Sequence, residues 1–499
     1  MFYPKFSKAV LCAVVLATIS VAAPAGTSIP VSESSASVAP ARSSSAISVA
    51  STASSVDTSS VLVSAVPSSV APTSASGLES ASDAARHPSS TASSVEPSAT
   101  VPYASDDPNG VMWDPSTNGT PQAIRGSLGA TVLGPQDVAI VKENPDLLAP
   151  PTTDSGTVGN AKWPFSLSHN RLQTGGWARQ ENVGVMPMAT SMAGVNMRLE
   201  AGAIRELHWH KTSEWGYILK GTVQVTAVNS DGQDYLGTVS QGDLWYFPPG
   251  IPHSLQATAD LADGAEFLLV FGDGAFSEDS TFLLTDWLAH VPKDVIAKNF
   301  QTNISAFDHI PADELYIFPS TPPADNAQAP TSPQGASSEP YTYSFSKVAA
   351  TQLSGGSAKV VDSTTFKIST EIAAAEVTVE PGAMREMHIP SPMGKLLRIL
   401  ESEGTARMTL FASSGQARTF NYQAGDVGFV PASFGHYVEN TGNTTLRFLE
   451  IFNTDRFQDI SLNQWLALTP PDLVKAHLQL DDDTIAHLSK TKPTVIGPA

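Results

Sequence analysis

Short runs in which apolar and polar residues alternate dominate the chain beyond residue 124. The segments 222–228 (TVQVTAV) and 375–380 (AEVTVE) alternate with a period of two, which predicts strands that bury one face. Gly, Pro, Asn and Asp separate such runs, as turns between short strands require. Patterns typical of helices follow at 281–290 and 292–300. The sequence therefore predicts an all-β protein with peripheral helices.

The strand pattern occurs twice along the chain. Three blocks recur in the same order: residues 200–208 (EAGAIRELH) as 380–388 (EPGAMREMH), residues 242–253 as 425–436, and the Trp-Leu pair at 287–288 as the pair at 465–466. Such ordered repetition indicates a duplicated domain. Many short, evenly spaced strands are typical of antiparallel sandwiches and barrels, including double-sheet jelly rolls. We therefore predict two tandem jelly-roll β-barrel domains.

Composition marks the limits of these domains. Residues 319–340 are rich in Pro, Ala and Ser and lack a hydrophobic period, so we expect a linker there. The N-terminal domain then covers residues 124–318, and the C-terminal domain covers residues 341–492. Residues 26–105 consist mainly of Ser, Ala, Val, Thr and Pro and cannot bury enough apolar surface to fold. We expect this segment to be a disordered stalk.

The first 25 residues have the layout of a secretory signal peptide. Lys5 and Lys8 precede an apolar run at 9–19, and small residues follow it. The run is too short to span a bilayer, which disfavours the alternative of a membrane anchor. The single cysteine, Cys12, lies inside this segment, so disulfides cannot stabilise the secreted protein. We expect a secreted protein, extracellular or associated with the cell wall.

The chain is strongly acidic, with a formal net charge of -20 from 48 acidic and 28 basic residues. Such a surface repels nucleic acids and anionic membranes, so we expect neither as a partner. An anionic substrate would be repelled as well, so local cations and a metal would have to overcome this field. Three sequons, at Asn118, Asn303 and Asn443, are compatible with glycosylation of a secreted protein.

Four residues of the first copy have the spacing of metal ligands. His208 and His210 lie two apart, so on a strand both imidazoles point to one face. Glu214 keeps the same parity if the strand resumes, and His253 arrives on a later strand. Three imidazoles and one carboxylate suit Mn, Fe or Zn. Solvated or merely buried histidines are the alternative, which an ordered set of four disfavours.

The ligands belong to longer motifs. Glycines and ligands follow one another as Gly202-x5-His208-x-His210-x3-Glu214-x6-Gly221 and as Gly242-x5-Pro248-x-Gly250-x2-His253. This order resembles the two cupin motifs, and with its second copy the chain is similar to the bicupin family, specifically the oxalate decarboxylases, over roughly residues 124–492. One departure is Ala257, where the second motif often has Asn. The resemblance implies Mn²⁺ and O2 as cofactors and cleavage of the small molecule oxalate to formate and CO2.

The resemblance also implies a role for Arg205. It takes the place of the arginine that acts in catalysis and binds the substrate, and its guanidinium suits a carboxylate. Strict strand alternation would put Arg205 on the face opposite to His208, so this role requires a bend or bulge near Gly202. The alternative is a surface arginine in a salt bridge.

A short segment resembles the mobile lid of the decarboxylases, in which a glutamate delivers the proton that yields formate. Its residues are Ser277, Glu278, Asp279, Ser280 and Thr281. Glu278 takes the catalytic place, and Asp279 stands where the family more often has Asn. The added negative charge would raise the proton affinity of the lid glutamate. On the residues alone, both acids could instead be charges at the start of the following helix.

The second copy departs from the pattern. His388 and His436 recur, but Pro390 replaces the second histidine of the pair, and no glutamate stands at the expected place. Two imidazoles are half a site, so we expect a degenerate second site with little or no metal, and about one Mn²⁺ per chain. The counterpart of the lid, residues 457–461, lacks the Ser-Glu element. We expect this domain to supply structure and a surface for a homo-oligomer.

Three other functions stay open on the sequence. An oxalate oxidase with the same fold would give CO2 and H2O2, and Glu278 as a proton donor favours the decarboxylase. A non-catalytic storage or cell-wall bicupin is disfavoured by the intact ligand set. A sugar-modifying cupin would leave the lid unexplained.

Overall fold

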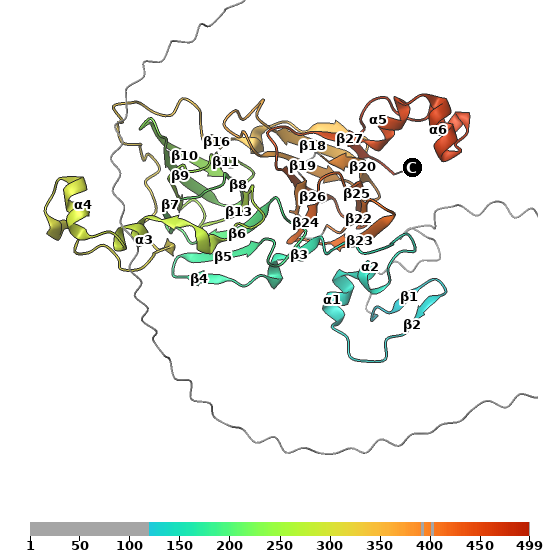
Figure 1. The fold of residues 1–499 in the computed structure, drawn as a ribbon, viewed down its shortest axis with the longest axis horizontal. Coiled ribbons are helices and arrows are strands. Elements are labelled where there is room, and N and C mark those ends of the chain that lie inside the picture. Colours follow the sequence, from blue (N-terminus) through green and yellow to red (C-terminus); the bar gives the residue numbers. More distant parts are fainter. Residues whose placement is uncertain (1–118, 391–393, 401–403, 499) are drawn as a thin grey trace, which may run out of the picture. The chain divides into compact units, whose positions relative to one another are not determined.

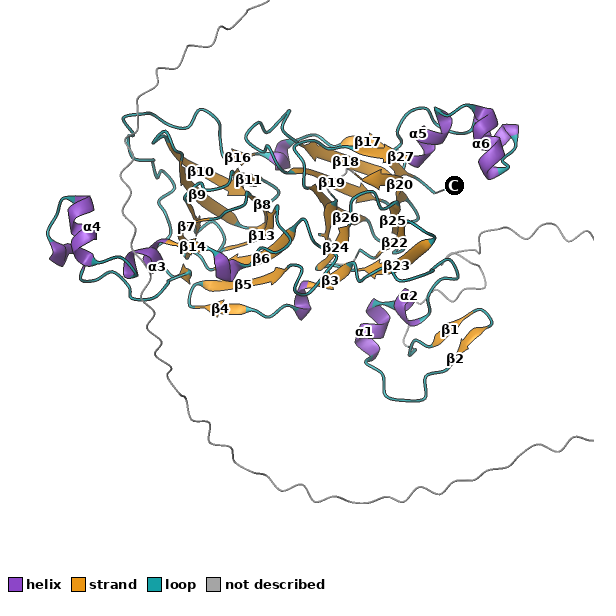
Figure 2. Cartoon of the chain, in the orientation of Figure 1, coloured by secondary structure: helices purple, strands orange, loops and turns teal. Residues whose placement is uncertain are grey.

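The computed structural model describes residues 119–390, 394–400 and 404–498. The expected signal peptide, the expected stalk and the sequon at Asn118 lie outside these residues. Both expected barrels fall within one compact unit, Ala92–Ala499. Figure 1 labels the elements of this unit, and Figure 2 shows that strands make up most of them.

The N-terminal barrel consists of two antiparallel sheets. The seven-stranded sheet has the order β16-β11-β8-β13-β6-β5-β4, and the other has the order β10-β9-β12-β7-β14 with β15 beside β7. The bounds are β4 Arg171–Gln173, β5 Gly176–Glu181, β6 Ala193–Leu199, β7 Ile204–Trp209, β8 Glu214–Lys220, β9 Thr222–Val228, β10 Asp234–Ser240, β11 Leu244–Phe247, β12 His253–Ala257, β13 Ala265–Phe271, β14 Phe282–Leu283, β15 Ile317–Phe318 and β16 Thr342–Tyr343. The predicted strand at 222–228 is confirmed.

The C-terminal barrel repeats this arrangement. Its sheets have the orders β17-β18-β19-β26-β21-β24-β3 and β23-β22-β25-β20-β27, with β28 beside β20. The bounds are β3 Lys162–Pro164, β17 Thr351–Leu353, β18 Gly356–Val361, β19 Ala373–Val379, β20 Met384–Pro390, β21 Lys395–Ile399, β22 Ala406–Ala412, β23 Gln416–Tyr422, β24 Asp426–Val430, β25 His436–Asn440, β26 Leu446–Phe452, β27 Asp459–Ser461 and β28 Val495–Ile496. Two matching pairs of sheets confirm the predicted tandem jelly-roll fold.

Helices are short and lie outside the sheets. They are α1 Val138–Glu143, α2 Pro145–Leu148, α3 Leu284–Ala289, α4 Lys293–Phe300, α5 Leu462–Ala467, α6 Pro471–Leu478 and α7 Asp482–Ala486. The helix expected at 281–290 begins only at Leu284, because Phe282 and Leu283 pair with β7 as the short strand β14. A hairpin of β1 Ala123–Arg125 and β2 Leu128–Ala130 precedes α1. Within the described residues, no helix is both long and apolar enough to cross a membrane.

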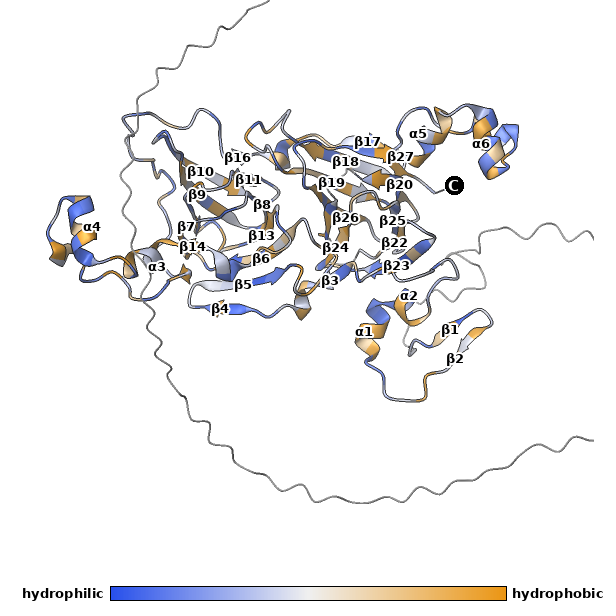
Figure 3. Ribbon diagram, viewed as in Figure 1, coloured by the Kyte–Doolittle hydropathy of each residue, from blue (hydrophilic) through white to orange (hydrophobic). Residues whose placement is uncertain are grey.

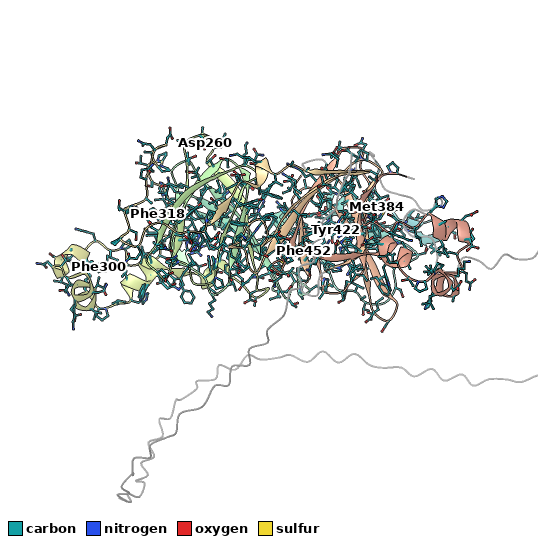
Figure 4. The ribbon with its side chains drawn as sticks, turned by 90° about the horizontal axis from the view of Figure 1, so that it is seen from above. Asp260, Phe300, Phe318, Met384, Tyr422 and Phe452 are labelled. Atoms are coloured by element: carbon teal, nitrogen blue, oxygen red, sulfur yellow. The ribbon has the colours of Figure 1, made fainter. Side chains whose placement is uncertain are left out.

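Each barrel has its own apolar core, and a third core joins the two. The core between the barrels contains Trp215, Tyr246 and Leu268 from the first barrel and Phe429 and Ile451 from the second. Figure 3 shows apolar strands through both barrels, and Figure 4 shows the side chains that fill them. The barrels therefore share buried apolar surface, which holds them together without a disulfide.

Two strands cross the domain limits expected from composition. Strand β3 pairs with β24 of the C-terminal barrel, and β16 pairs with β11 of the N-terminal barrel. The segment before β3 also packs on the C-terminal barrel, because buried Asp146 accepts hydrogen bonds from Arg125 Nη2 and Arg407 Nε, each at 2.7 Å. Strand pairing therefore crosses the domain limits expected from composition. Each barrel covers a sheet edge with a strand from across the boundary.

Candidate active site

Four side chains meet inside the N-terminal barrel. His208 lies near the end of β7, His210 directly follows this strand, and Glu214 and His253 are the first residues of β8 and β12. Their ligand atoms all lie within 4.8 Å of one another, and all four residues are buried. Glu214 Oε2 lies 3.0 Å from His210 Nε2 and 3.2 Å from His253 Nε2. The predicted set is therefore brought together as one cluster.

Backbone carbonyls orient two of the imidazoles. The Nδ1 of His208 faces the carbonyl oxygen of Glu206, and the Nδ1 of His253 lies 2.8 Å from the carbonyl oxygen of Ile251. A carbonyl can only accept, so each Nδ1 carries the proton and each Nε2 keeps its lone pair for the centre. This arrangement is typical of histidines that bind a metal.

Burial sets the charge of the cluster. Burial lowers the pKa of His208 well below its ordinary value, and nearby Arg205 acts in the same direction. Burial also lowers the pKa of His210. Burial alone would raise the pKa of Glu214, but His253 and His210 reverse this effect and hold that pKa below its usual range. Neutral imidazoles beside a carboxylate are the protonation states that bind a cation, so the donor set fits Mn²⁺.

Two aromatic side chains, Trp245 and Phe247, contact Glu214 and His253 and restrict their orientation. Trp245 Nε1 donates a hydrogen bond to Glu214 Oε1 at 2.8 Å, which leaves Oε2 directed at the histidines. Phe247 stacks on His253, with ring centroids 4.0 Å apart. Such supporting contacts limit the rotamers of the ligands before any ion binds.

A β-bulge brings Arg205 towards the cluster. On β12, His253 pairs with His208 of β7, and Leu255 pairs with Arg205. These two pairs are two residues apart on β12 but three residues apart on β7. The extra residue in β7 shifts the side-chain alternation between 205 and 208. The bulge expected near Gly202 is therefore present, and it lies between Arg205 and His208. Arg205 is 1% exposed, so the alternative of a surface arginine is wrong.

The segment predicted to be the lid contacts Arg205 beside the cluster. Its Glu278 is 5% exposed, and Glu278 Oε2 accepts hydrogen bonds from Arg205 Nη2 and from the Tyr316 hydroxyl, each at 2.9 Å. The other oxygen, Oε1, is buried without a hydrogen-bond partner among the described residues. Burial raises the pKa of Tyr316 well above its ordinary value, and Glu278 adds to that effect, so its hydroxyl remains a donor.

Two residues that hold the lid were not found by sequence reasoning. Gln180 Oε1 accepts from the Glu278 backbone N–H at 2.9 Å, and its Nε2 donates to Ser277 Oγ at 3.2 Å. Tyr316 stands just before β15, outside both motifs. No spacing signal points to either residue, because both reach the site only through the fold. Glu278 and Asp279 open a short 3-10 helix, Glu278–Ser280, and β14 separates them from α3, so they do not stand at the start of the helix expected at 281–290.

A cavity of about 710 Å³ is lined in part by Glu278 and Asp279. Its lining includes Glu278, Tyr316, His169, Arg171 and Arg179. Arg171 Nη1 lies 3.4 Å from Asp279 Oδ1, and its guanidinium lies 3.7 Å above the Tyr316 ring. The wall of this cavity therefore carries cations in an otherwise acidic protein.

The second copy also brings two histidines and a glutamate together inside its barrel. His388 and His436 lie with ring centroids 4.1 Å apart, and Glu450 joins them within 4.8 Å. Sequence reasoning missed Glu450 because it stands on β26, whereas the first site takes its glutamate from β8. The expected place of that glutamate holds Lys395, and Pro390 ends β20. The second cluster therefore contains a carboxylate as well as two imidazoles, and the prediction of two imidazoles alone is wrong.

The counterpart of the lid in the second copy differs as predicted. Its Asp459, at the start of β27, forms buried ion pairs with Arg385 and with Lys492. Arg385 corresponds to Arg205, so an acid again meets this arginine. The acid comes from a strand that pairs with β20, and no Ser-Glu element precedes it.

Comparison with known proteins identifies the chain's relatives. The cupin family model matches residues 168–306 and 345–486. The chain is 51% identical over 380 residues to the oxalate decarboxylase OxdC of Bacillus subtilis (strain 168), a match that covers 76% of this chain and 97% of the relative. It is 39% identical over 374 residues to a probable oxalate decarboxylase of Arthroderma benhamiae, covering 74% of this chain and 91% of that protein.

Solved structures agree with this similarity. A structure of Bacillus subtilis oxalate decarboxylase, studied for its Mn(II) centres, matches with a TM-score of 0.73 at 50% identity and covers 76% of this chain and 100% of that chain. A structure of the same enzyme at pH 4.6 matches with a TM-score of 0.72 at 51% identity, covering 76% and 98%.

Proposed function

Because the chain belongs to the cupin family and, within it, to the bicupin oxalate decarboxylases, we propose that the first barrel alone carries the reaction. The enzyme converts oxalate and one proton to formate and CO2, with Mn²⁺ and O2 as cofactors. The observation that carries the proposal is the buried contact of Glu278 with Arg205 beside a complete ligand set. In the second barrel, a lysine stands where the first has its ligand glutamate.

His208, His210, Glu214 and His253 would hold the Mn²⁺. When bound, the ion together with O2 supplies the one-electron chemistry that weakens the carbon–carbon bond of oxalate. Arg205 would bind a carboxylate of the substrate, because its guanidinium is buried beside the cluster and its Nε has no hydrogen-bond partner among the described residues. In a buried site, such charge-assisted hydrogen bonds orient the dianion strongly.

Glu278 would supply the proton that turns the carbon left after CO2 departs into formate. Its Oε1 is the buried oxygen without a partner, so it is the atom from which a proton can pass to the substrate. Arg205 and Tyr316 hold Oε2 and fix the direction of the carboxyl group. The closed lid excludes bulk water, which would otherwise compete as a proton donor.

The cavity outside the lid would admit oxalate. Arg171 and Arg179 line it, and local cations can attract a dianion against the net charge of -20. The ion pair of Arg171 with Asp279 joins the cavity wall to the lid. An incoming anion can compete for Arg171 and so release this contact.

An assay of formate and peroxide together tests the proposal. We expect Glu278→Ala to lose formate production by about 100-fold or more, since general acid catalysis contributes about 10²–10⁴-fold. Its Mn content should stay at the wild-type level, because Glu278 is no ligand. The exposed Asp231→Asn, in the β9–β10 turn, is the control and should behave as wild type. Formate from Glu278→Ala equal to that of wild type, or peroxide as the main wild-type product, would contradict the proposal.

We also propose that the protein is secreted and glycosylated. Within the described residues, the sequon residues Asn303 and Asn443 are both exposed, as glycan attachment requires. Expression in a eukaryotic secretory host followed by endoglycosidase digestion should give a discrete loss of mass. An unchanged mass, with both peptides found unmodified, would contradict glycosylation.

A homo-oligomer is proposed from two apolar helical arms. The exposed apolar residues of the first arm, α3–α4 with the turn that follows, are Trp287, Val295, Phe300 and Ile304, and those of the second, α5–α6, are Trp465, Leu468, Leu473 and Leu478. Exposed apolar residues gathered on one short arm favour an interface. A second copy of the chain is the proposed occupant.

A further inference from the structure

Strand register places Lys395 where the first barrel has its ligand glutamate. Glu214 pairs with Phe271 of β13, and Lys395 pairs with the equivalent Phe452 of β26. On the other side, Glu214 pairs with Phe247 of β11, and Lys395 pairs with Val430 of β24. Both residues are the first of their strand and are buried. The cation therefore enters the second barrel at the position of an anionic ligand.

The amino group of Lys395 contacts two of the three donors of the second cluster, and His436 Nε2 has no hydrogen-bond partner among the described residues. Lys395 Nζ lies 2.9 Å from His388 Nε2 and forms an ion pair with Glu450 Oε1. His388 Nδ1 lies 2.7 Å from the carbonyl oxygen of Glu386, so its proton is there and its Nε2 accepts from the ammonium. The lone pair and the carboxylate oxygen that would bind a metal are thus already used.

Glu450 is the matching anion, and the first barrel has no equivalent of it. In the pairing of the central strands, Leu269 faces Val195 in the first barrel, and Glu450 faces Ala375 in the second. Lys395 and Glu450 therefore replace Glu214 and Leu269 together. Both side chains are fully buried, and a buried charge is tolerated only when it is paired.

We propose that the ammonium group of Lys395 takes the place of the metal ion in the second barrel, with Glu450 and His388 as its partners. The second barrel then needs no metal to balance its buried carboxylate. A divalent cation at the same point would lie beside a buried ammonium, and like charges repel strongly where the dielectric constant is low. The residues present here do not fit the second metal site that duplication implies.

Metal content measured on the whole protein gives the first test. Wild-type protein, loaded with excess Mn²⁺ and then desalted, should contain about one ion per chain by elemental analysis and one class of Mn²⁺ signal by electron paramagnetic resonance. The double variant His208→Ala/His253→Ala removes two ligands of the first site and should retain essentially none. One ion per chain kept by that variant would overturn the proposal, because only the second cluster could hold it.

A double-mutant cycle on the ion pair gives the second test. Lys395→Met removes the ammonium and leaves buried Glu450 with Arg385 Nε, 3.4 Å from its Oε2, as its remaining cation, so we expect a lower melting temperature. Glu450→Leu, which installs the residue of the first barrel, should also lower it. The double variant Lys395→Met/Glu450→Leu should recover much of the loss. Strictly additive effects would overturn the proposal.

The same variants separate an ion pair from a hidden metal site. If Lys395 replaces the metal, Glu450→Leu should keep about one Mn²⁺ per chain, and a chelator should shift the melting temperature of the His208→Ala/His253→Ala protein by no more than that of a buffer blank. A fall in Mn content in Glu450→Leu would overturn the proposal. Since these readouts need no oxalate, they stand apart from the test of the decarboxylase reaction.

Discussion

At the scale of single residues, the lid carboxyl depends on groups that lie far from it in sequence. Glu278 is held by Arg205 from β7, by Gln180 from β5 and by Tyr316 from the segment before β15. Gln180 accepts from the backbone N–H of Glu278, whereas Arg205 and Tyr316 both donate to its Oε2. The carboxyl group can therefore point its other oxygen at a substrate without rotating away.

Tyr316→Phe tests this support. It removes the hydroxyl that donates to Glu278 Oε2 and leaves the ring beneath Arg171 and Arg205. A hydrogen bond to a charged group is worth about 1.5–3 kcal/mol, so we expect formate production to fall about 10–100-fold with unchanged Mn content. Tyr235→Phe is the matched control, since its hydroxyl contacts Thr342 instead. Equal activity of both variants would show that Tyr316 does not position the lid.

A second residue gives a prediction for the pH dependence of stability. Burial raises the pKa of Glu181 from 4.5 to about 8, and the Gly194 backbone N–H offsets only part of this rise. A carboxyl group whose pKa is higher in the folded than in the unfolded protein contributes fully to stability at pH values below its pKa in the unfolded chain. This contribution is lost as the pH rises through its pKa in the folded protein. The loss should therefore occur between pH 4.5 and about 8, on the order of a few kcal/mol.

Glu181→Gln should remove this loss. Its melting temperature should match that of wild type near pH 4.5 and exceed it increasingly up to pH 8. Asp263→Asn, an exposed carboxylate before β13, is the control and should show no such divergence. Parallel curves for Glu181→Gln and wild type over this range would mean that Glu181 is ionised in the fold without cost.

Sequence spacing was enough to predict that the four candidate ligands cluster, but it did not predict the residues that support them. His208, His210, Glu214 and His253 follow from strand parity and from motifs, because a metal needs several donors at fixed intervals. Tyr316 leaves no such trace, since one hydroxyl can reach the lid from any loop that the fold brings near. Glu450 was missed for the same reason.

At the scale of elements, neighbouring strands hold the ligand glutamate. Gly216 of β8 pairs with Trp245 of β11, and a Cβ at Gly216 would lie 2.1 Å from the Trp245 ring. The glycine therefore lets the indole lie across β8 and donate to Glu214 Oε1. Close packing of two strands thus fixes the direction of one metal ligand.

Trp245→Phe removes the N–H donor of this pair and replaces the buried indole by a smaller aromatic ring. We expect Mn²⁺ affinity to fall about 10–100-fold, as is usual when a partner of a ligand is lost. Competition with a chelator of known affinity measures the change. Trp163→Phe serves as the control, because its indole donates to Ser168 instead. Unaltered Mn²⁺ affinity in Trp245→Phe would mean that the ligands alone fix Glu214.

Sequence patterns predicted which segments form strands better than they predicted which strands pair with one another. Alternation predicted the strands at 222–228 and 375–380, although β19, which contains most of the second segment, is buried on both faces. It could not show that β3 completes the second barrel or that β16 completes the first. A short strand has the same pattern whichever sheet edge it covers, so the exchange depends on the three-dimensional course of the chain.

At the scale of the whole molecule, the two barrels keep one fold and divide their tasks. The first barrel retains donors for a metal, and the second fills the equivalent place with a buried ion pair. The second barrel still contributes the core shared between them and a helical arm. Loss of a site is tolerated here because packing, not metal binding, makes the barrel stable.

The helical arms give the last prediction. Arms α3–α4 and α5–α6 extend from the two barrels, and Figure 4 labels Phe300 on the first of them. Phe300 is 57% exposed and Leu468 is 64% exposed, which is costly for a free monomer unless a second copy covers them. Light scattering coupled to size-exclusion chromatography should therefore give an oligomer for wild type and a smaller species for Phe300→Asp/Leu468→Asp. Leu133→Asp, which changes a residue that is 95% exposed outside both arms, should leave the mass unchanged. A monomeric wild type, or an oligomer that survives both arm substitutions, would exclude the arms as the contact between copies.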